Sequence, residues 1–80
     1  MTKILITEFI NQNSIENLKK KFEIKYDEKI YENKLKLENI IHNYEGLIVR
    51  NKTQVDSNFL KKAKKLKFIG RLGVGLDNID

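Results

Sequence analysis

Two segments of the sequence combine residue types that bind small anions. Arg50 and Asn51 follow one expected strand, and Gly73, Val74 and Gly75 follow the next expected strand along the chain. A guanidinium stays charged and can bind a carboxylate or a phosphate through two parallel N–H groups. Glycines let the backbone N–H groups of a turn approach an anion closely, because no side chain blocks the way. These five residues are therefore the predicted binding site for an anionic small molecule.

The glycines do not match a dinucleotide-binding loop. Residues 70–75 read GRLGVG, which has the spacing GxxGxG. The dinucleotide fingerprint is GxGxxG, followed by an acidic residue about twenty positions later. The segment also leads into a polar turn at Asp77 instead of directly into a helix. We therefore assign no cofactor-binding residue to this chain.

Few residues of the sequence could hold a metal ion or perform nucleophilic catalysis. The chain has no cysteine and one histidine, His42, which falls beside the apolar stripe of an expected helix. A protein metal site needs several ligands that converge on one point. Acidic residues near the end of the chain, such as Asp77 and Asp80, are typical of turns and helix caps. We predict neither a metal site nor a catalytic residue within this chain.

Composition indicates one small domain and argues against two classes of partner. The 80 residues include 16 Lys or Arg and 11 Asp or Glu, which gives a net charge of +5. The lysines within residues 61–65 would surround a helix, and no aromatic side chains alternate with them, so no nucleic-acid partner is predicted. The first apolar run is broken by Thr7 and Glu8 and is too short for a membrane span. We expect a cytoplasmic protein with no membrane partner.

The first part of the chain predicts a strand, a helix and a second strand. Residues 4–6 form a continuous apolar run, which is typical of a parallel strand buried on both faces. Asn13 is the expected N-cap of the helix, with Glu16 three residues later. Residues Glu23–Tyr26 alternate polar and apolar, which indicates an edge strand covered on one side. The helix would pack on the sheet through Ile15, Leu18 and Phe22.

The rest of the chain predicts two further helices and two further strands. Gly46 would end the second helix in a left-handed conformation, and the apolar stripe of that helix is Leu37, Ile40, Ile41 and Tyr44. Residues 47–49 and 68–69 are the third and fourth strands. Asp56 is the expected N-cap of the third helix, with a hydrophobic staple between Val55 and Leu60. The residues expected to face the sheet from this helix are Phe59, Leu60 and Ala63.

This order of strands and helices predicts an α/β fold with a flavodoxin-like parallel sheet. Right-handed crossovers would place helices on both faces of that sheet. Ligands of open parallel sheets bind beyond the carboxyl ends of the strands, where Arg50, Asn51 and the turn at 70–75 would lie on one edge. The pattern stops within a turn, so we expect a truncated βαβαβαβ unit that forms part of a larger domain.

The segment IVRNKTQV, followed by LKFIGRLGVGLDNID, resembles the substrate-domain signature of the D-isomer-specific 2-hydroxyacid dehydrogenases. The resemblance covers residues 46–80, whereas residues 1–45 agree only in their order of strands and helices. The pair VRxxT and GRxGVGxDNID is most similar to the phosphoglycerate dehydrogenase branch of this family.

The resemblance implies that residues 1–80 are the N-terminal part of a substrate-binding domain, with the NAD-binding domain and the catalytic residues outside this chain. The full-length parent would oxidise D-3-phosphoglycerate with NAD to 3-phosphohydroxypyruvate in serine biosynthesis, as a homo-oligomer. By position, Arg50 and Asn51 would lie near the substrate, and the backbone N–H groups of Val74 and Gly75 would hold its carboxylate. The chain alone would not transfer hydride.

Other functions stay open on the sequence alone. The parent could act on another 2-hydroxy acid or as a glyoxylate/hydroxypyruvate reductase, or the chain could be an inactive remnant. A non-enzymatic binding module, such as a phosphoacceptor receiver domain, is a further alternative. Such a domain needs an acidic pair after the first strand and an aspartate after the third, whereas this chain has Glu8 and Arg50 there. The residues therefore favour the enzyme.

Overall fold

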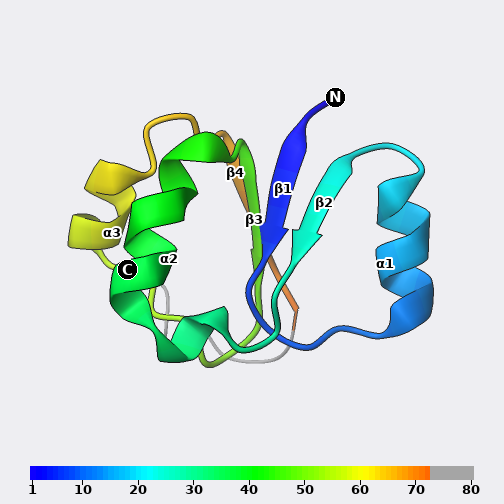
Figure 1. Ribbon diagram of the computed structural model, residues 1–80, viewed down its shortest axis with the longest axis horizontal. Helices are drawn as coiled ribbons and strands as arrows, with labels where there is room; N and C mark the ends of the chain where they lie inside the picture. Colours follow the sequence, from blue (N-terminus) through cyan, green and yellow to red (C-terminus); the bar gives the residue numbers. More distant parts are fainter. Residues whose placement is uncertain (73–80) are drawn as a thin grey trace.

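A four-stranded parallel sheet forms the centre of the molecule, and its strands alternate with helices along the chain (Figure 1). The computed structural model describes residues 1–72. The strand order is β2-β1-β3-β4, which matches the start of the flavodoxin-like order. The elements in chain order are β1 (Lys3–Ile6), α1 (Gln12–Lys19), β2 (Glu23–Tyr26), η1 (Ile30–Glu32), α2 (Lys34–Ile40), η2 (Ile41–Asn43), β3 (Gly46–Val49), α3 (Ser57–Lys62) and β4 (Phe68–Arg71).

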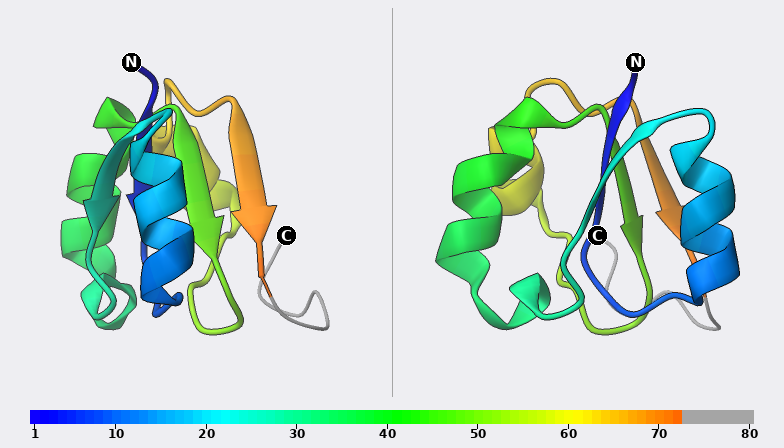
Figure 2. Two further views of the ribbon diagram at one scale, coloured as in Figure 1. Left: turned by 90° about the vertical axis from the view of Figure 1, so that its right-hand side faces the viewer. Right: turned by 45° about the vertical axis from the view of Figure 1, so that its right-hand side comes forward.

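Helices cover both faces of the sheet, as the sequence predicted. Helix α1 lies on one face, and α2 and α3 lie on the other (Figures 1 and 2). The apolar run of β1 supplies both cores, because successive side chains of a strand point to opposite faces. Ile4 and Ile6 pack with Ile15 of α1, whereas Leu5 packs with Leu37 of α2. Each large apolar side chain removed from water stabilises the fold by roughly 1.5–3 kcal/mol.

Strand β2 lies at one edge of the sheet, as its alternating pattern predicted. Its residues alternate between exposed and partly buried, and Ile24 and Tyr26 pack against the α1 side of the core. The β1 register pairs Lys3 with Glu23 and Ile6 with Tyr26. Strand β4 lies at the opposite edge, beside β3 (Figure 2).

The N-cap predicted for the first helix was wrong by two residues. Asn11 has an extended backbone and its Oδ1 accepts the N–H of Ser14 at 2.8 Å, so Asn11 is the cap and Asn13 lies inside the first turn. A cap must keep a non-helical backbone while its side chain reaches the N–H of the third helical residue, and Asn11 meets both conditions. The change leaves Ile15 buried, whereas Phe22 lies beyond the end of the helix.

Gly46 does not end the second helix, contrary to the prediction. Helix α2 begins after Asn33, whose Oδ1 accepts the N–H of Lys36 at 3.1 Å, and it tightens into the 3-10 turn η2 before Tyr44 becomes extended. Gly46 is instead the first residue of β3 and pairs with Phe68 of β4. Its missing side chain leaves room for the Phe68 ring, because a Cβ there would overlap Cζ of that ring. Glycine is therefore needed here for close packing and not for a turn.

The third helix confirms its cap and corrects one inward residue. Asp56 caps α3 by accepting the N–H of Phe59 at 2.8 Å. Phe59 and Ala63 are buried, whereas Leu60 is 38% exposed and does not face the sheet. Residues four apart share one face of a helix, and Leu60 is turned about 100° away from Phe59.

Strand β4 is longer than predicted and includes part of the expected glycine turn. Gly70 pairs with Ile48 and Arg71 with Val49, so both residues belong to the sheet. A backbone that can form ladder hydrogen bonds with β3 continues as a strand even at a glycine. The predicted site residues Gly73, Val74 and Gly75 lie outside the described residues.

Candidate functional site

The loops that follow β1, β2 and β3 meet at one edge of the sheet, below the strands in Figure 1. Parallel strands point the same way, so their carboxyl ends must share an edge. Arg50 and Asn51 lie at this edge, directly after β3, and both are exposed. The structure therefore places these two predicted residues on the edge where open parallel sheets bind ligands.

A buried carboxylate organises this edge. Glu8 follows β1 and is only 3% exposed. Its Oε2 accepts the backbone N–H groups of Arg50 at 2.8 Å and Thr53 at 2.9 Å, and its Oε1 accepts the N–H of Lys52 at 2.9 Å. The hydroxyl of Thr53 lies 2.7 Å from Oε2 and donates to it. Glu8 thus holds the loop that carries Arg50.

The hydrogen bonds around Glu8 keep its carboxyl group ionised. Burial alone would raise the pKa of Glu8 above the ordinary value. The Thr53 hydroxyl and the backbone N–H groups of Arg50, Thr53 and Lys52 lower that pKa, and their combined effect prevails. Since the Thr53 proton points to a carboxylate, Thr7 must donate in the 2.7 Å contact between the two threonine hydroxyls. This chain of polar groups joins β1 to the loop after β3.

Arg50 is held at two points by neighbouring residues of the segment after β1. Its backbone N–H reaches Glu8, and its Nη1 donates to the carbonyl oxygen of Phe9 at 3.2 Å. The Arg50 side chain borders two hollows. One, of about 390 Å³, is lined by Glu8, Phe9, Glu28, Lys29, Tyr31, Arg50, Asn51 and Lys52. The other, of about 230 Å³, is lined by Ile10, Asn11, Ser14, Arg50 and Leu72.

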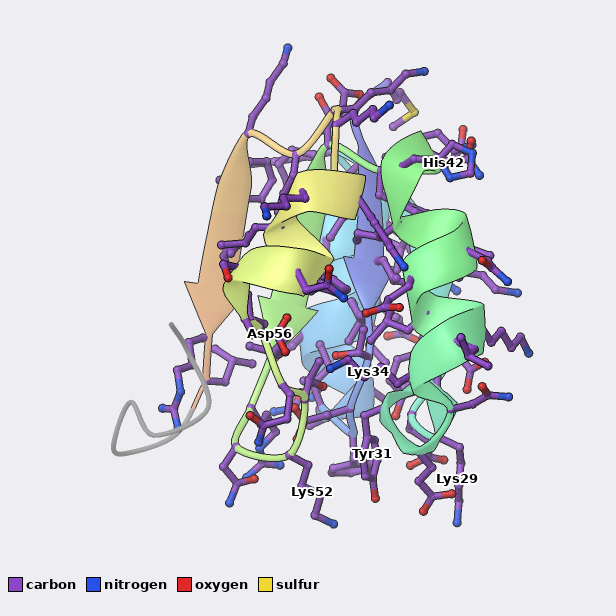
Figure 3. All side chains as sticks on the ribbon, turned by 90° about the vertical axis from the view of Figure 1, so that its left-hand side faces the viewer. Lys29, Tyr31, Lys34, His42, Lys52 and Asp56 are labelled. Carbon is purple, nitrogen blue, oxygen red and sulfur yellow. The ribbon has the colours of Figure 1, made fainter. Side chains whose placement is uncertain are left out.

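The larger of these hollows has a cationic lining. Lys29, Arg50 and Lys52 bring three positive charges to it, whereas Glu28 brings a negative charge and the carboxylate of Glu8 is bonded to the loop. The Nζ of Lys52 lies 3.5 Å from the hydroxyl of Tyr31 and 5.4 Å from the centre of its ring. Figure 3 shows Lys29, Tyr31 and Lys52 together at this end of the molecule. Such a lining is suited to a small anion.

Sequence reasoning missed several residues that shape this edge. Glu8 was considered only as a possible phosphoacceptor, and Lys29, Tyr31 and Lys52 were not proposed at all. A signal for Glu8 existed, because a charge that directly follows a buried strand must find hydrogen-bond partners or neutralise. Lys29 and Tyr31 gave no comparable signal, since their place depends on the path of η1.

The remaining candidates lie away from this edge or form no site. His42 is exposed in η2, at the opposite end of the molecule (Figure 3). Among residues 1–72, no three His, Cys, Asp or Glu side chains are grouped so that they could hold a metal ion. Within the same part of the chain, no helix is both long and apolar enough to cross a membrane.

Comparison with known proteins relates the chain to one family. Residues 4–80 match the D-isomer specific 2-hydroxyacid dehydrogenase, catalytic domain. The chain is 36% identical, over all 80 residues, to (S)-sulfolactate dehydrogenase of Chromohalobacter salexigens and covers 26% of that protein. It is 40% identical over 80 residues to D-3-phosphoglycerate dehydrogenase of Methanocaldococcus jannaschii and covers 15% of it.

A solved structure agrees with these sequence matches. A protein of Pyrococcus horikoshii superposes on the whole chain with a TM-score of 0.90 and 28% identity, and the chain covers 23% of that protein. The chain thus spans about a quarter or less of the length of these relatives.

Proposed function

Because this chain belongs to the D-isomer specific 2-hydroxyacid dehydrogenase family, we propose that its residues form part of the substrate-binding domain of an oxidoreductase that acts on a 2-hydroxy acid. We further propose an acid with a second anionic group, with D-3-phosphoglycerate as the substrate and NAD as the cofactor. The observation that carries this proposal is the position of Arg50 at the carboxyl end of β3, between two hollows. Arg50 and Asn51 would bind the substrate, together with the turn at 73–75.

The names of the relatives support a substrate with two anionic groups. Phosphoglycerate and sulfolactate are both three-carbon 2-hydroxy acids whose third carbon carries a phosphate or a sulfonate. An acid of this kind needs two cationic contacts on one wall of a site. The hollow lined by Lys29, Arg50 and Lys52 offers more than one. The choice between phosphate and sulfonate is part of the proposal.

The described residues do not fit a dinucleotide. A pyrophosphate at a Rossmann-type site binds the turn after the first strand, where glycines let the backbone approach it. In this chain the buried carboxylate of Glu8 follows β1, and the N–H groups that it accepts come from the neighbouring loop. A carboxylate at that point would repel a pyrophosphate. We therefore place cofactor binding and hydride transfer outside residues 1–72 and derive no step from them.

The proposal is tested with the full-length enzyme that carries this chain. Arg50→Gln should raise KM for D-3-phosphoglycerate by about a hundredfold, because a charged, bidentate contact is lost. Arg50→Lys should recover only part of this loss, since an ammonium cannot form the paired contact. Wild-type kinetics with D-3-phosphoglycerate, sulfolactate and D-glycerate would rank the acids. An Arg50→Gln enzyme with unchanged KM for its best acid would remove the role proposed for Arg50.

A further inference from the structure

The loop after β3 directs its backbone N–H groups toward one point, and the protein fills that point with its own carboxylate. Successive N–H groups that converge in this way form a concave site for an anion. Here the N–H groups of Arg50, Lys52 and Thr53 all meet Glu8 within 2.8–2.9 Å. These three groups are therefore not available to a substrate anion. Recognition at this loop must instead come from side chains.

The same two neighbouring residues hold both ends of Arg50. Glu8 accepts the backbone N–H of Arg50, and the carbonyl of Phe9 accepts its Nη1 at 3.2 Å. A long arginine side chain loses much conformational entropy when a ligand fixes it. Holding both the main chain and the guanidinium beforehand removes part of that cost, which is the principle of preorganisation.

We infer that Glu8 is a positioning residue for Arg50: its carboxylate fixes the loop 50–53 so that the guanidinium faces the substrate edge before substrate binds. The inference rests on the proposed function, because Glu8 has this role only if Arg50 binds substrate. Glu8 itself touches neither substrate nor cofactor in this scheme. Its ionised state supports the assignment, since an anion is the better acceptor for several converging donors.

The decisive variant is Glu8→Gln in the full-length enzyme, because glutamine has nearly the same size and shape. Its amide keeps one oxygen, but its NH₂ group must face at least one backbone N–H of the loop, donor against donor. The loop should then lose its fixed position. KM for D-3-phosphoglycerate should rise about tenfold while kcat changes by less than about twofold.

A matched control separates positioning from a general loss of stability. Glu45→Gln makes the same chemical change at the opposite edge of the sheet, where the carboxylate has contacts of 3.4 and 3.5 Å. Its KM should equal that of the wild type. If Glu8→Gln does not fold, Thr53→Val provides a second test. That variant keeps Glu8 and the backbone N–H groups, removes one donor at 2.7 Å, and should raise KM about two- to threefold.

Each outcome decides between the two proposals. Higher KM in both Arg50→Gln and Glu8→Gln supports both. Higher KM in Arg50→Gln together with an unchanged KM in Glu8→Gln overturns the role of Glu8 and leaves the proposed function intact. A fall in kcat with unchanged KM also overturns it, because a smaller folded fraction alone would produce that result. Unchanged KM in Arg50→Gln overturns the proposed function, and the positioning role of Glu8 falls with it.

Discussion

Glu8 and Glu45 lie at opposite edges of the sheet, and their surroundings differ sharply. Glu8 is 3% exposed and has four donors within 2.7–2.9 Å, three of them backbone N–H groups. The side chain of Glu45 is 29% exposed; one oxygen lies 3.4 Å from the N–H of Lys3 and the other 3.5 Å from Nζ of Lys67. Short bonds to backbone groups fix a loop, whereas long contacts to an exposed lysine compete with water. The same residue type therefore organises one edge and adds little to the other.

The two edges also teach that the size of a hollow does not identify a site. The edge where the strands begin has a hollow of about 530 Å³, larger than the one beside Arg50, and four lysines line it: Lys3, Lys64, Lys65 and Lys67. Three of these lysines follow the carboxyl end of α3, where positive charge stabilises the helix dipole. Their presence has a structural explanation. At the other edge, Arg50 follows a strand and has no helix end to stabilise.

The largest expected effect is that of removing the carboxylate of Glu8. Glu8→Ala would leave three backbone N–H groups and one hydroxyl without their acceptor, and we expect a loss of more than about 3 kcal/mol in the free energy of unfolding. Urea denaturation followed by circular dichroism measures this value. Glu45→Ala is the matched control and should cost less than about 1 kcal/mol. Equal losses in the two variants would contradict the contrast between the edges.

A smaller loss is expected from Gly46→Ala at the edge where the strands begin. The new Cβ would overlap Cζ of Phe68 and lie 2.6 Å from its Cε2 and 3.0 Å from Cγ1 of Ile4. The Phe68 ring is 42% exposed and can turn toward solvent, whereas Ile4 is buried and cannot. We therefore expect a loss of about 2 kcal/mol, measured as a shift of the urea midpoint.

A double variant checks the cause of that loss. Phe68→Ala removes the ring that the new methyl group would meet. The double variant Gly46→Ala, Phe68→Ala should therefore lose less stability than the sum of the two single variants. Strict additivity would show that the cost of Gly46→Ala comes from the backbone of β3 and not from the packing of Phe68.

Acid should weaken the edge that Glu8 organises. The folded-state pKa of Glu8 is lowered from 4.5, so its contribution is present above the unfolded pKa and is lost as pH falls through the lower folded value. Glu8→Gln cannot titrate at this position. The stability difference between wild type and Glu8→Gln should thus be largest near neutral pH and shrink as pH falls below 4.5. The pKa of Asp56 is also lowered, chiefly by the N–H of Phe59, but Asp56 is present in both proteins and cancels in the difference. A constant difference from pH 7 to pH 3 would contradict this account.

Much of the fold was predictable because it depends on local patterns. The apolar runs at 4–6 and 47–49 fixed two buried strands, and the alternation at Glu23–Tyr26 identified the edge strand. Helix ends were less predictable. Asn11 and Asn13 are equally good caps by residue type, and only the extended backbone at Asn11 decides between them. Gly46 likewise suits a helix end by type, and its real partner, Phe68, lies in another strand.

The candidate site was predictable only in part, for the same reason. The location of Arg50 and Asn51 follows from the rule that parallel strands end at a common edge. The contacts that hold Arg50 do not, because Glu8 lies 42 residues away in the sequence and nothing local links the two. Lys29 reaches the same hollow only because η1 turns the chain back toward it.

The smallest expected effect closes the comparison of the two edges. Lys64 and Lys65 are exposed beyond the end of α3, so changing both to glutamine should alter the free energy of unfolding by less than about 0.5 kcal/mol. KM for D-3-phosphoglycerate in the full-length enzyme should stay at its wild-type value. Lys29→Gln removes the same charge at the other edge and should raise that KM severalfold. If the Lys64, Lys65 pair raised KM as much as Lys29 does, the substrate would respond to overall charge, and the lining of the hollow beside Arg50 would lose its significance.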